Sequence, residues 1–170
     1  MKILVASDIH GSIKHLAFLY KAFLAEKPNK VIFLGDMFDS FDGCNDELVD
    51  QLKKFPYSIF IRGNCDKYHD VVHSGFDFQN SYSFMEFQKR FFCSHGNIYN
   101  ETIYPEEDFD IMLGGHTHIG RIFEKDHKLF LNPGSLSLPK GDSTNSYMII
   151  DEEGIYLKDL NGKLLEEKKW

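Results

Sequence analysis

Five short apolar segments of this sequence each end in a glycine beside Asp, Asn or His, and this recurring pattern is the strongest constraint on its fold. The polar ends read DIHG (8–11), GDMFD (35–39), GNCD (63–66), SHG (94–96) and GGHTH (114–118). Short, continuous apolar runs bounded by turn residues are typical of buried strands. Ligand sites in α/β sheets lie just beyond the carboxyl ends of the strands. The sequence therefore predicts a metal-capable cluster at the ends of five strands.

The first 61 residues alternate between predicted strands and predicted helices. Ser12 is a candidate N-cap for a helix over residues 12–26, because apolar residues recur there at helical spacing. A shorter helix is expected to begin at Asp46 and to end before Pro56. Strands are expected at residues 2–7, 31–34 and 57–61. This β-α-β-α-β order predicts parallel strands.

The second half of the chain contains short strands that follow one another with turn signals between several of them. They are expected at residues 82–85, 87–94, 111–114, 121–124, 128–131, 146–150 and 155–160. Parallel β-α-β units in the first half of the chain and antiparallel hairpins in the second half together predict two mixed sheets packed face to face, with helices outside. The charged tail, residues 166–169, is interpreted as a solvated run. We expect one domain over residues 1–170.

Composition excludes several classes of protein. The formal net charge of −7 argues against a nonspecific nucleic-acid or membrane surface, since both need a basic face. A phosphate substrate stays compatible with this charge, because a bound metal inverts the local potential. The three cysteines form no CxxC pair, and no apolar run approaches the roughly 18 residues of a membrane span. A cytoplasmic location is expected, and the oligomeric state, including a homo-oligomer, stays open.

Each motif taken alone is also ordinary turn chemistry, because Asp and Asn side chains commonly bond the backbone of a turn. GHTH is more specific, since two histidines two apart on an extended segment point the same way. The five motifs in this order resemble the signature of the calcineurin-like metallophosphoesterase superfamily. The GNCD variant and the later segment NPGSLSLPKG (132–141) are most similar to its compact YfcE-like branch.

The resemblance implies a four-layer αββα sandwich of two mixed sheets and a centre for two divalent ions. Its first ion would be held by Asp8, His10, Asp36 and His118. Its second ion would be held by Asp36, Asn64, His95 and His116, with Asp36 bridging. The mixed oxygen and nitrogen ligands favour manganese, with iron, zinc or nickel as alternatives. The implied activity is hydrolysis of a small or nucleotide-like phosphodiester by a hydroxide that bridges the metals.

One residue departs from the family pattern. Most members have histidine after the asparagine of the GN motif, where it contacts the substrate phosphate or protonates the leaving oxygen, and this chain has Cys65. A thiol hydrogen-bonds weakly, so we predict that proton supply is poor; simple packing of Cys65 is the alternative. Asp36, Asn64 and Cys65 are therefore the predicted catalytic group. Asp39 is expected to support His10 or another ligand, and Asp66 to orient its loop.

Two other functions stay open at this point. One is a phosphomonoesterase or phosphoprotein phosphatase, although GDMFDSF (35–41) lacks the arginine that Ser/Thr phosphatases of the superfamily carry just after GDxxD. The other is a protein-interaction scaffold of the same fold, in which the ligand set is degraded. The complete ligand set of this chain favours an enzyme whose partner is a small phosphate ester.

Overall fold

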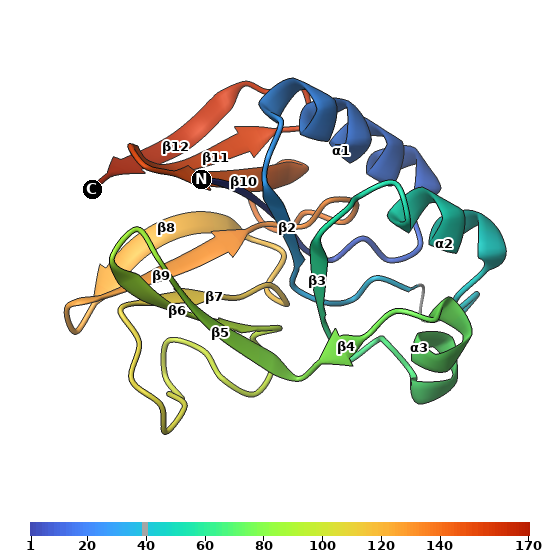
Figure 1. The fold of residues 1–170 in the computed structure, drawn as a ribbon, viewed down its shortest axis with the longest axis horizontal. Helices are drawn as coiled ribbons and strands as arrows, with labels where there is room; N and C mark the ends of the chain where they lie inside the picture. The colour runs from blue at the N-terminus through green and yellow to red at the C-terminus, as the bar shows by residue number, and fades with distance from the viewer. Residues whose placement is uncertain (39–40) are drawn as a thin grey trace.

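The computed structural model describes residues 1–38 and 41–170, and it contains two mixed sheets flanked by three helices (Figure 1). The helices are α1 (Ile13–Glu26), α2 (Asp46–Leu52) and α3 (Tyr68–Ser74). The seven-stranded sheet has the order β12 (Leu164–Lys169), β11 (Gly154–Asp159), β10 (Ser146–Asp151), β1 (Lys2–Ala6), β2 (Lys30–Phe33), β3 (Ser58–Ile61) and β4 (Phe78–Gln79). The five-stranded sheet has the order β5 (Ser81–Glu86), β6 (Lys89–Ser94), β7 (Ile111–Leu113), β9 (Lys128–Pro133) and β8 (Gly120–Lys125).

Strand β1 shows why the apolar runs are continuous. Its alternate residues Leu4 and Ala6 pack in the cluster that includes α1 and α2, and Ile3 and Val5 pack in the cluster between the two sheets. All four are fully buried. A strand that is buried on both faces needs apolar residues at every position. The pairing of β1, β2 and β3 is parallel, which confirms the predicted β-α-β arrangement.

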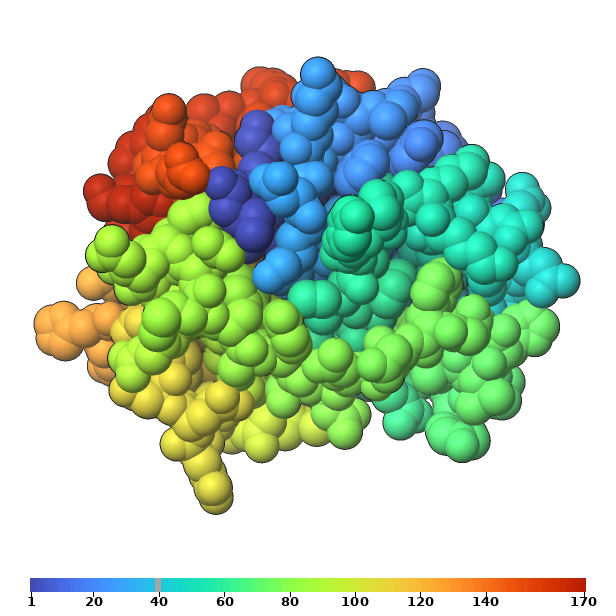
Figure 2. All heavy atoms as spheres, viewed as in Figure 1, coloured from blue at the N-terminus to red at the C-terminus, as the bar shows by residue number. Residues whose placement is uncertain are grey.

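A third cluster covers the outer face of the five-stranded sheet. Phe92, Met112 and Phe130 from the sheet pack against Phe109, which belongs to the long segment between β6 and β7. This segment (yellow) projects from the lower edge of the molecule in Figures 1 and 2. On this face, a loop therefore provides the cover that helices provide on the other sheet.

The structure corrects several expected elements. The N-cap of α2 is Asn45, whose side chain accepts a hydrogen bond from Leu48 N at 2.9 Å, and not Asp46. The charged tail remains exposed but pairs with β11 as the edge strand β12. Helix α3 and strand β4 were not expected, because both are short and lack a clear periodic pattern. Within the described residues, no helix has the length and apolarity of a membrane span.

Glu26, the last residue of α1, holds the helix to the seven-stranded sheet. Its carboxylate lies 2.6 Å from Lys158 Nζ on β11 and 3.4 Å from Lys2 Nζ on β1. Burial alone would raise its pKa, but the two lysines outweigh burial and lower it. A lowered folded-state pKa stabilises the fold above the unfolded pKa, and this contribution is lost as the pH falls through the folded value.

We therefore expect Glu26→Gln to lower the free energy of unfolding by about 1 kcal/mol at pH 7. The difference from the wild type should shrink as the pH falls below about 4.5, the ordinary pKa of a glutamate. Urea titrations at pH 7 and pH 4 measure both values. Glu47→Gln, on an exposed position of α2, is the control. An equal loss at both pH values would contradict the assigned ion pairs.

Candidate metal centre

The seven predicted ligands gather where β1, β2, β3, β6 and β7 end. Asp8, His10, Asp36 and His118 offer ligand atoms that all lie within 4.8 Å of one another. These four residues follow three different strands, and 108 residues separate His10 from His118. The geometry is that of a cluster able to surround one cation, on the residues that the resemblance assigned to the first ion.

The other three predicted ligands form a second group beside Asp36. His95 Nε2 is 3.4 Å from Asp36 Oδ2 and 3.1 Å from Asn64 Oδ1. The rings of His95 and His116 have centroids 5.1 Å apart. Asp36 Oδ2 is also 3.8 Å from His10 Nε2. Asp36 therefore lies between the two groups, at the position that a bridging carboxylate would occupy.

The backbone at these residues is unusual. Asp8, His10, Asp36, His116 and His118 all have positive φ angles, between 47° and 66°. Residues with a Cβ pay a steric cost in this region, and it persists only where the surroundings enforce it. The loops after β1 and β2 are joined by main-chain bonds, including Asp8 N to Gly35 O and His10 N to Asp36 O. Strained backbone held in this way is typical of functional sites.

Asp66 ties a third loop to the loop after β2. Its buried carboxylate accepts hydrogen bonds from the main-chain N–H groups of Asp36, Met37, Phe38 and Gly63 at 2.8–3.1 Å. Because these four N–H groups belong to the loops after β2 and β3, Asp66 orients both loops, as predicted from the sequence. The predicted supporting role of Asp39 lies outside the described residues.

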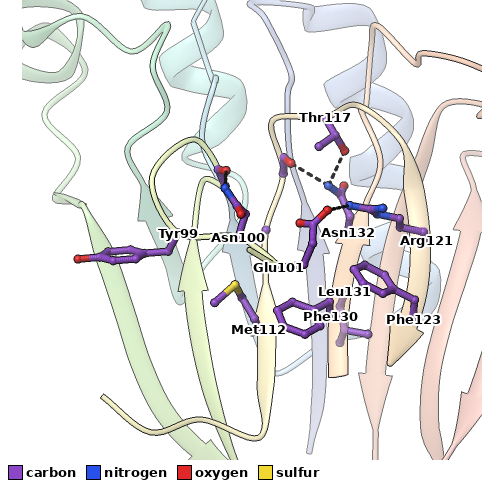
Figure 3. Close-up of a pocket in the computed structure, with 13 residues that line it drawn as sticks. Tyr99, Asn100, Glu101, Met112, Thr117, Arg121, Phe123, Phe130, Leu131 and Asn132 are labelled. Carbon is purple, nitrogen blue, oxygen red and sulfur yellow. Dashed lines mark hydrogen bonds and ion pairs between the residues drawn. The ribbon is translucent and has the colours of Figure 1, made fainter. Parts of the chain in front are cut away.

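The NPGSLSLPKG segment lies under the ligand loops. Asn132 donates through its amide to Thr117 Oγ1 at 3.0 Å (Figure 3) and to Gly115 O at 2.7 Å, and these two residues flank His116 in the sequence. Ser135 Oγ donates to Asp8 O at 2.8 Å. The segment is therefore a structural turn that supports the loops of the predicted ligands.

The donor chemistry at two histidines tests whether a cation fits. His118 Nδ1 lies 2.6 Å from Leu138 O, and His95 Nδ1 lies 2.7 Å from Leu34 O. A carbonyl only accepts, so both Nδ1 atoms carry the proton, and in neutral rings both Nε2 atoms carry a lone pair. His118 Nε2 faces Asp8 Oδ1 at 3.2 Å, and this buried oxygen has no hydrogen-bond partner among the described residues. Lone pairs that face one another this closely require a proton or a cation between them.

The pKa values of His95 and His118 also indicate that their surroundings favour a positive charge. Burial alone would lower the pKa of His95, but the Asp36 carboxylate outweighs it and raises the pKa above the ordinary value. The Asp8 carboxylate raises the pKa of His118. His116 differs, because burial and the neighbouring His95 lower its pKa. Metal ions compete for the same lone pairs, so the residues present fit divalent cations.

Two adjacent glycines give a matched test of this packing. A Cβ on Gly115 would lie 2.0 Å from Ser7 Oγ and 2.8 Å from Asp8 Oδ2, whereas a Cβ on Gly114 would meet no atom closer than 3.9 Å. We expect Gly115→Ala to displace Asp8 and to reduce metal affinity by about 10–100-fold, the range seen when ligand support is lost. Gly114→Ala should bind metal like the wild type. Isothermal calorimetry with Mn²⁺ compares them, and equal affinity of the two variants would refute the assignment.

Two positively charged residues near the predicted ligands were not identified by the sequence analysis. Arg62 immediately precedes GNCD, and its Nε donates to Asp66 O at 2.9 Å. Lys140 belongs to NPGSLSLPKG, and its main-chain N–H donates to His118 O at 3.2 Å. Their places beside the motifs were the available signal. His69 and His73, the histidines that follow GNCD, lie on α3 with side chains 75% and 52% exposed.

Cys65 contacts the predicted bridging carboxylate through its main chain. Its N–H donates to Asp36 Oδ1 at 2.8 Å, while Asn64 Nδ2 lies 3.5 Å from its sulfur. The residue is half-buried and is not in a disulfide. Cys65 therefore lies beside the predicted bridging carboxylate, at the sequence position where the resemblance implies a histidine.

Comparison with known proteins places this geometry in a family. A model of the calcineurin-like phosphoesterase superfamily domain matches residues 1–154. Phosphodiesterase YfcE of Escherichia coli (strain K12) is 27% identical over 173 residues, which cover 95% of this chain and 93% of YfcE. The probable metallophosphoesterase YsnB of Bacillus subtilis (strain 168) is 27% identical over 163 residues, which cover 90% of this chain and 85% of YsnB.

Solved structures agree on the fold. The structure of YfcE from E. coli superposes with a TM-score of 0.90 at 24% identity, covering 99% of each chain. Vacuolar Protein Sorting 29 from Cryptosporidium parvum superposes with a TM-score of 0.68 at 24% identity, covering 99% of this chain and 98% of that one. The predicted fold is thereby confirmed. Because the family model spans most of the sequence, the chain belongs to the calcineurin-like phosphoesterase superfamily and is a phosphoric ester hydrolase.

Proposed function

We propose that this protein is a metal-dependent phosphodiesterase that hydrolyses a small or nucleotide-like ester, with residues 1–170 acting as one catalytic unit. The observation that carries the proposal is the contact of two histidine Nε2 lone pairs with oxygen atoms at 3.1–3.2 Å. This pattern on both sides of Asp36 supports two cation positions. The similarity to YfcE supports a diester as the substrate.

The proposed ligands follow the two groups around Asp36. Asp8, His10, Asp36 and His118 would hold one ion. Asp36, Asn64, His95 and His116 would hold the other. Divalent ions bound there would supply an activated water and neutralise charge on the phosphoryl oxygens, and the mixed oxygen and nitrogen donors favour manganese. Two divalent ions and two carboxylates leave a local charge of about +2 by this count, so the site attracts a phosphate into a protein of net charge −7.

Cys65 contributes to the proposed reaction through its main chain and through its thiol. The main-chain N–H of Cys65 fixes Asp36 Oδ1, which keeps the carboxylate in place for both groups. The Cys65 thiol lies 3.5 Å from Asn64 Nδ2 and takes the sequence position of the family's usual histidine. A thiol is a weak hydrogen-bond donor, so a substrate with a good leaving group needs less help than one with a poor leaving group.

This assignment predicts the effect of Cys65→His. The imidazole should raise kcat/KM for diesters with poor leaving groups by at least about 10-fold. A well-positioned general acid contributes about 10²-fold or more, and an introduced histidine is expected to supply only part of that. The rate for bis(4-nitrophenyl) phosphate, whose leaving group is good, should change little. Cys65→Ser is the control of similar size. Unchanged or lower turnover of the poor-leaving-group diester would count against a role in proton transfer.

A manganese-dependent assay with bis(4-nitrophenyl) phosphate and 4-nitrophenyl phosphate tests the function itself. We expect the diester to be hydrolysed faster than the monoester. Faster hydrolysis of the monoester would establish a phosphomonoesterase. No turnover of either compound with metal bound would instead favour the protein-interaction scaffold that the sequence left open.

A further inference from the structure

A polar groove of about 460 Å³ opens beside the half of the metal centre that contains Asn64 and His95. One wall comes from the end of β3 and the turn between β4 and β5, where Arg62 and Asn80 lie. The other wall comes from the end of β6 and the loop after it, which contributes Asn97. Because Asn64 and His95 line both the groove and the centre, a ligand in the groove would adjoin a phosphate at the metals.

The charge of this groove is opposite to that of the chain. The protein has 26 acidic residues and a net charge of −7, yet no Asp or Glu is among the described residues that line the groove. Arg62 contributes a guanidinium, Asn80 and Asn97 contribute amides, and Ser81 contributes a hydroxyl. Guanidinium, amide and hydroxyl donors are the groups with which proteins bind phosphate oxygens.

The guanidinium is held in place while its terminal groups stay available. Arg62 Nε donates to Asp66 O at 2.9 Å, and the Arg62 main-chain N–H donates to Gln79 O at 2.8 Å. The two terminal NH₂ groups make no hydrogen bond or ion pair with any described residue, and neither do the side-chain amides of Asn80 and Asn97. An arginine anchored in this way offers a preorganised pair of donors that matches a phosphate.

We propose that this groove binds a second phosphate of the substrate. The inference rests on the proposed phosphodiesterase function, because the first phosphate then lies at the metal centre. The substrate class is a phosphate ester that carries another phosphate a few bonds from the reacting one, as in an ester of a nucleoside bisphosphate. Arg62 is the main specificity determinant, and Asn80 and Asn97 donate to the same anion.

A matched pair of substrates tests the proposal. Thymidine 5′-(4-nitrophenyl phosphate) and its 3′-phosphorylated form share the reacting group and the leaving group, and differ only in the second phosphate. We expect the manganese-loaded wild type to prefer the 3′-phosphorylated form by about 10-fold in kcat/KM, or about 1.4 kcal/mol. Arg62→Gln should reduce this ratio to about one. Arg62→Lys should give an intermediate ratio, because lysine keeps the charge and loses the planar fork.

Two further variants separate a local contact from general charge or misfolding. Lys163→Gln removes one exposed positive charge beside β12, at the opposite edge of the seven-stranded sheet from β4, and should keep the wild-type ratio. Asn97→Asp leaves the Arg62 anchor intact, places a carboxylate in the groove and should lower the ratio below that of the wild type. A ratio near one in the wild type, or a ratio unchanged by Arg62→Gln, would overturn the proposal.

Binding measurements distinguish failure of this inference from failure of the proposed function. Isothermal calorimetry compares thymidine 3′,5′-bisphosphate with thymidine 5′-monophosphate on the manganese-loaded protein. About 10-fold tighter binding of the bisphosphate, lost in Arg62→Gln, would support the groove even if neither ester were hydrolysed. Hydrolysis of both esters at equal rates, with equal binding of the two nucleotides, would leave the phosphodiesterase standing and remove the second-phosphate site.

Discussion

Asp36→Asn should lower kcat/KM for a phosphodiester by at least about 10³-fold, or about 4 kcal/mol of transition-state stabilisation. Asp36 is the residue that lies between the two groups of predicted ligands, with Oδ2 3.4 Å from His95 Nε2 and 3.8 Å from His10 Nε2. Asparagine has nearly the same shape but no charge, and its neutral amide is a weaker ligand than a carboxylate oxygen that faces both groups. Its loss therefore weakens both positions at once.

The control for this variant removes a carboxylate of the same kind elsewhere. Asp50→Asn lies on α2, where the side chain is 70% exposed and pairs with Lys53 at 3.1 Å. It should keep both activity and metal content. Kinetics with bis(4-nitrophenyl) phosphate, metal analysis by atomic emission and thermal melts together separate loss of metal from loss of fold. An Asp36→Asn protein that retains full metal content and activity would exclude the bridging role.

Removal of divalent metal by a chelator should abolish hydrolysis and lower the melting temperature by roughly 5–10 °C. Metal present at 100 times its dissociation constant contributes about 2.7 kcal/mol, and a chain of this length shifts by about 2–4 °C per kcal/mol. The physical reason is the close approach of lone pairs at His95 and His118, which a cation relieves. Differential scanning calorimetry with and without Mn²⁺ measures the shift.

The pH dependence of this shift has a definite sign. In the metal-free protein, the pKa values of His95 and His118 are raised above 6.5 by Asp36 and Asp8. A raised folded-state pKa stabilises the fold below the unfolded value, and this contribution is lost as the pH rises through the folded value. The difference in melting temperature between loaded and metal-free protein should therefore grow from pH 6 to pH 8. A melting temperature that Mn²⁺ does not change at any pH would argue against a metal centre.

The sequence predicted the strands that end at the site better than the short elements around it. Strand β1 is recognisable because burial on both faces demands an unbroken apolar run, and its end at DIHG follows directly. Helix α3 and strand β4 have no comparable pattern, since seven and two residues are too few to show a period. The tail was predicted as solvated and is exposed, but its pairing with β11 depends on main-chain bonds that its charged side chains do not indicate.

The candidate site also combines features that the sequence predicted with features that only the tertiary structure shows. The types and order of its predicted ligands can be found in the sequence, because Asp, Asn and His are metal-binding residue types and each of the motifs places them beside glycine at a strand end. Only the tertiary structure decided how they meet: Asp36 between two groups, positive φ angles at five predicted ligands, and Asp66 accepting four N–H groups from two loops. The groove around Arg62 was also decided by the tertiary structure, because it joins residues 62–64, 80–81, 94–95 and 97–99, which the packing of β3, β4 and β6 brings together. Short motifs determine which functional groups follow each strand, whereas the packing of the two sheets sets the distances between loops that are far apart in the chain.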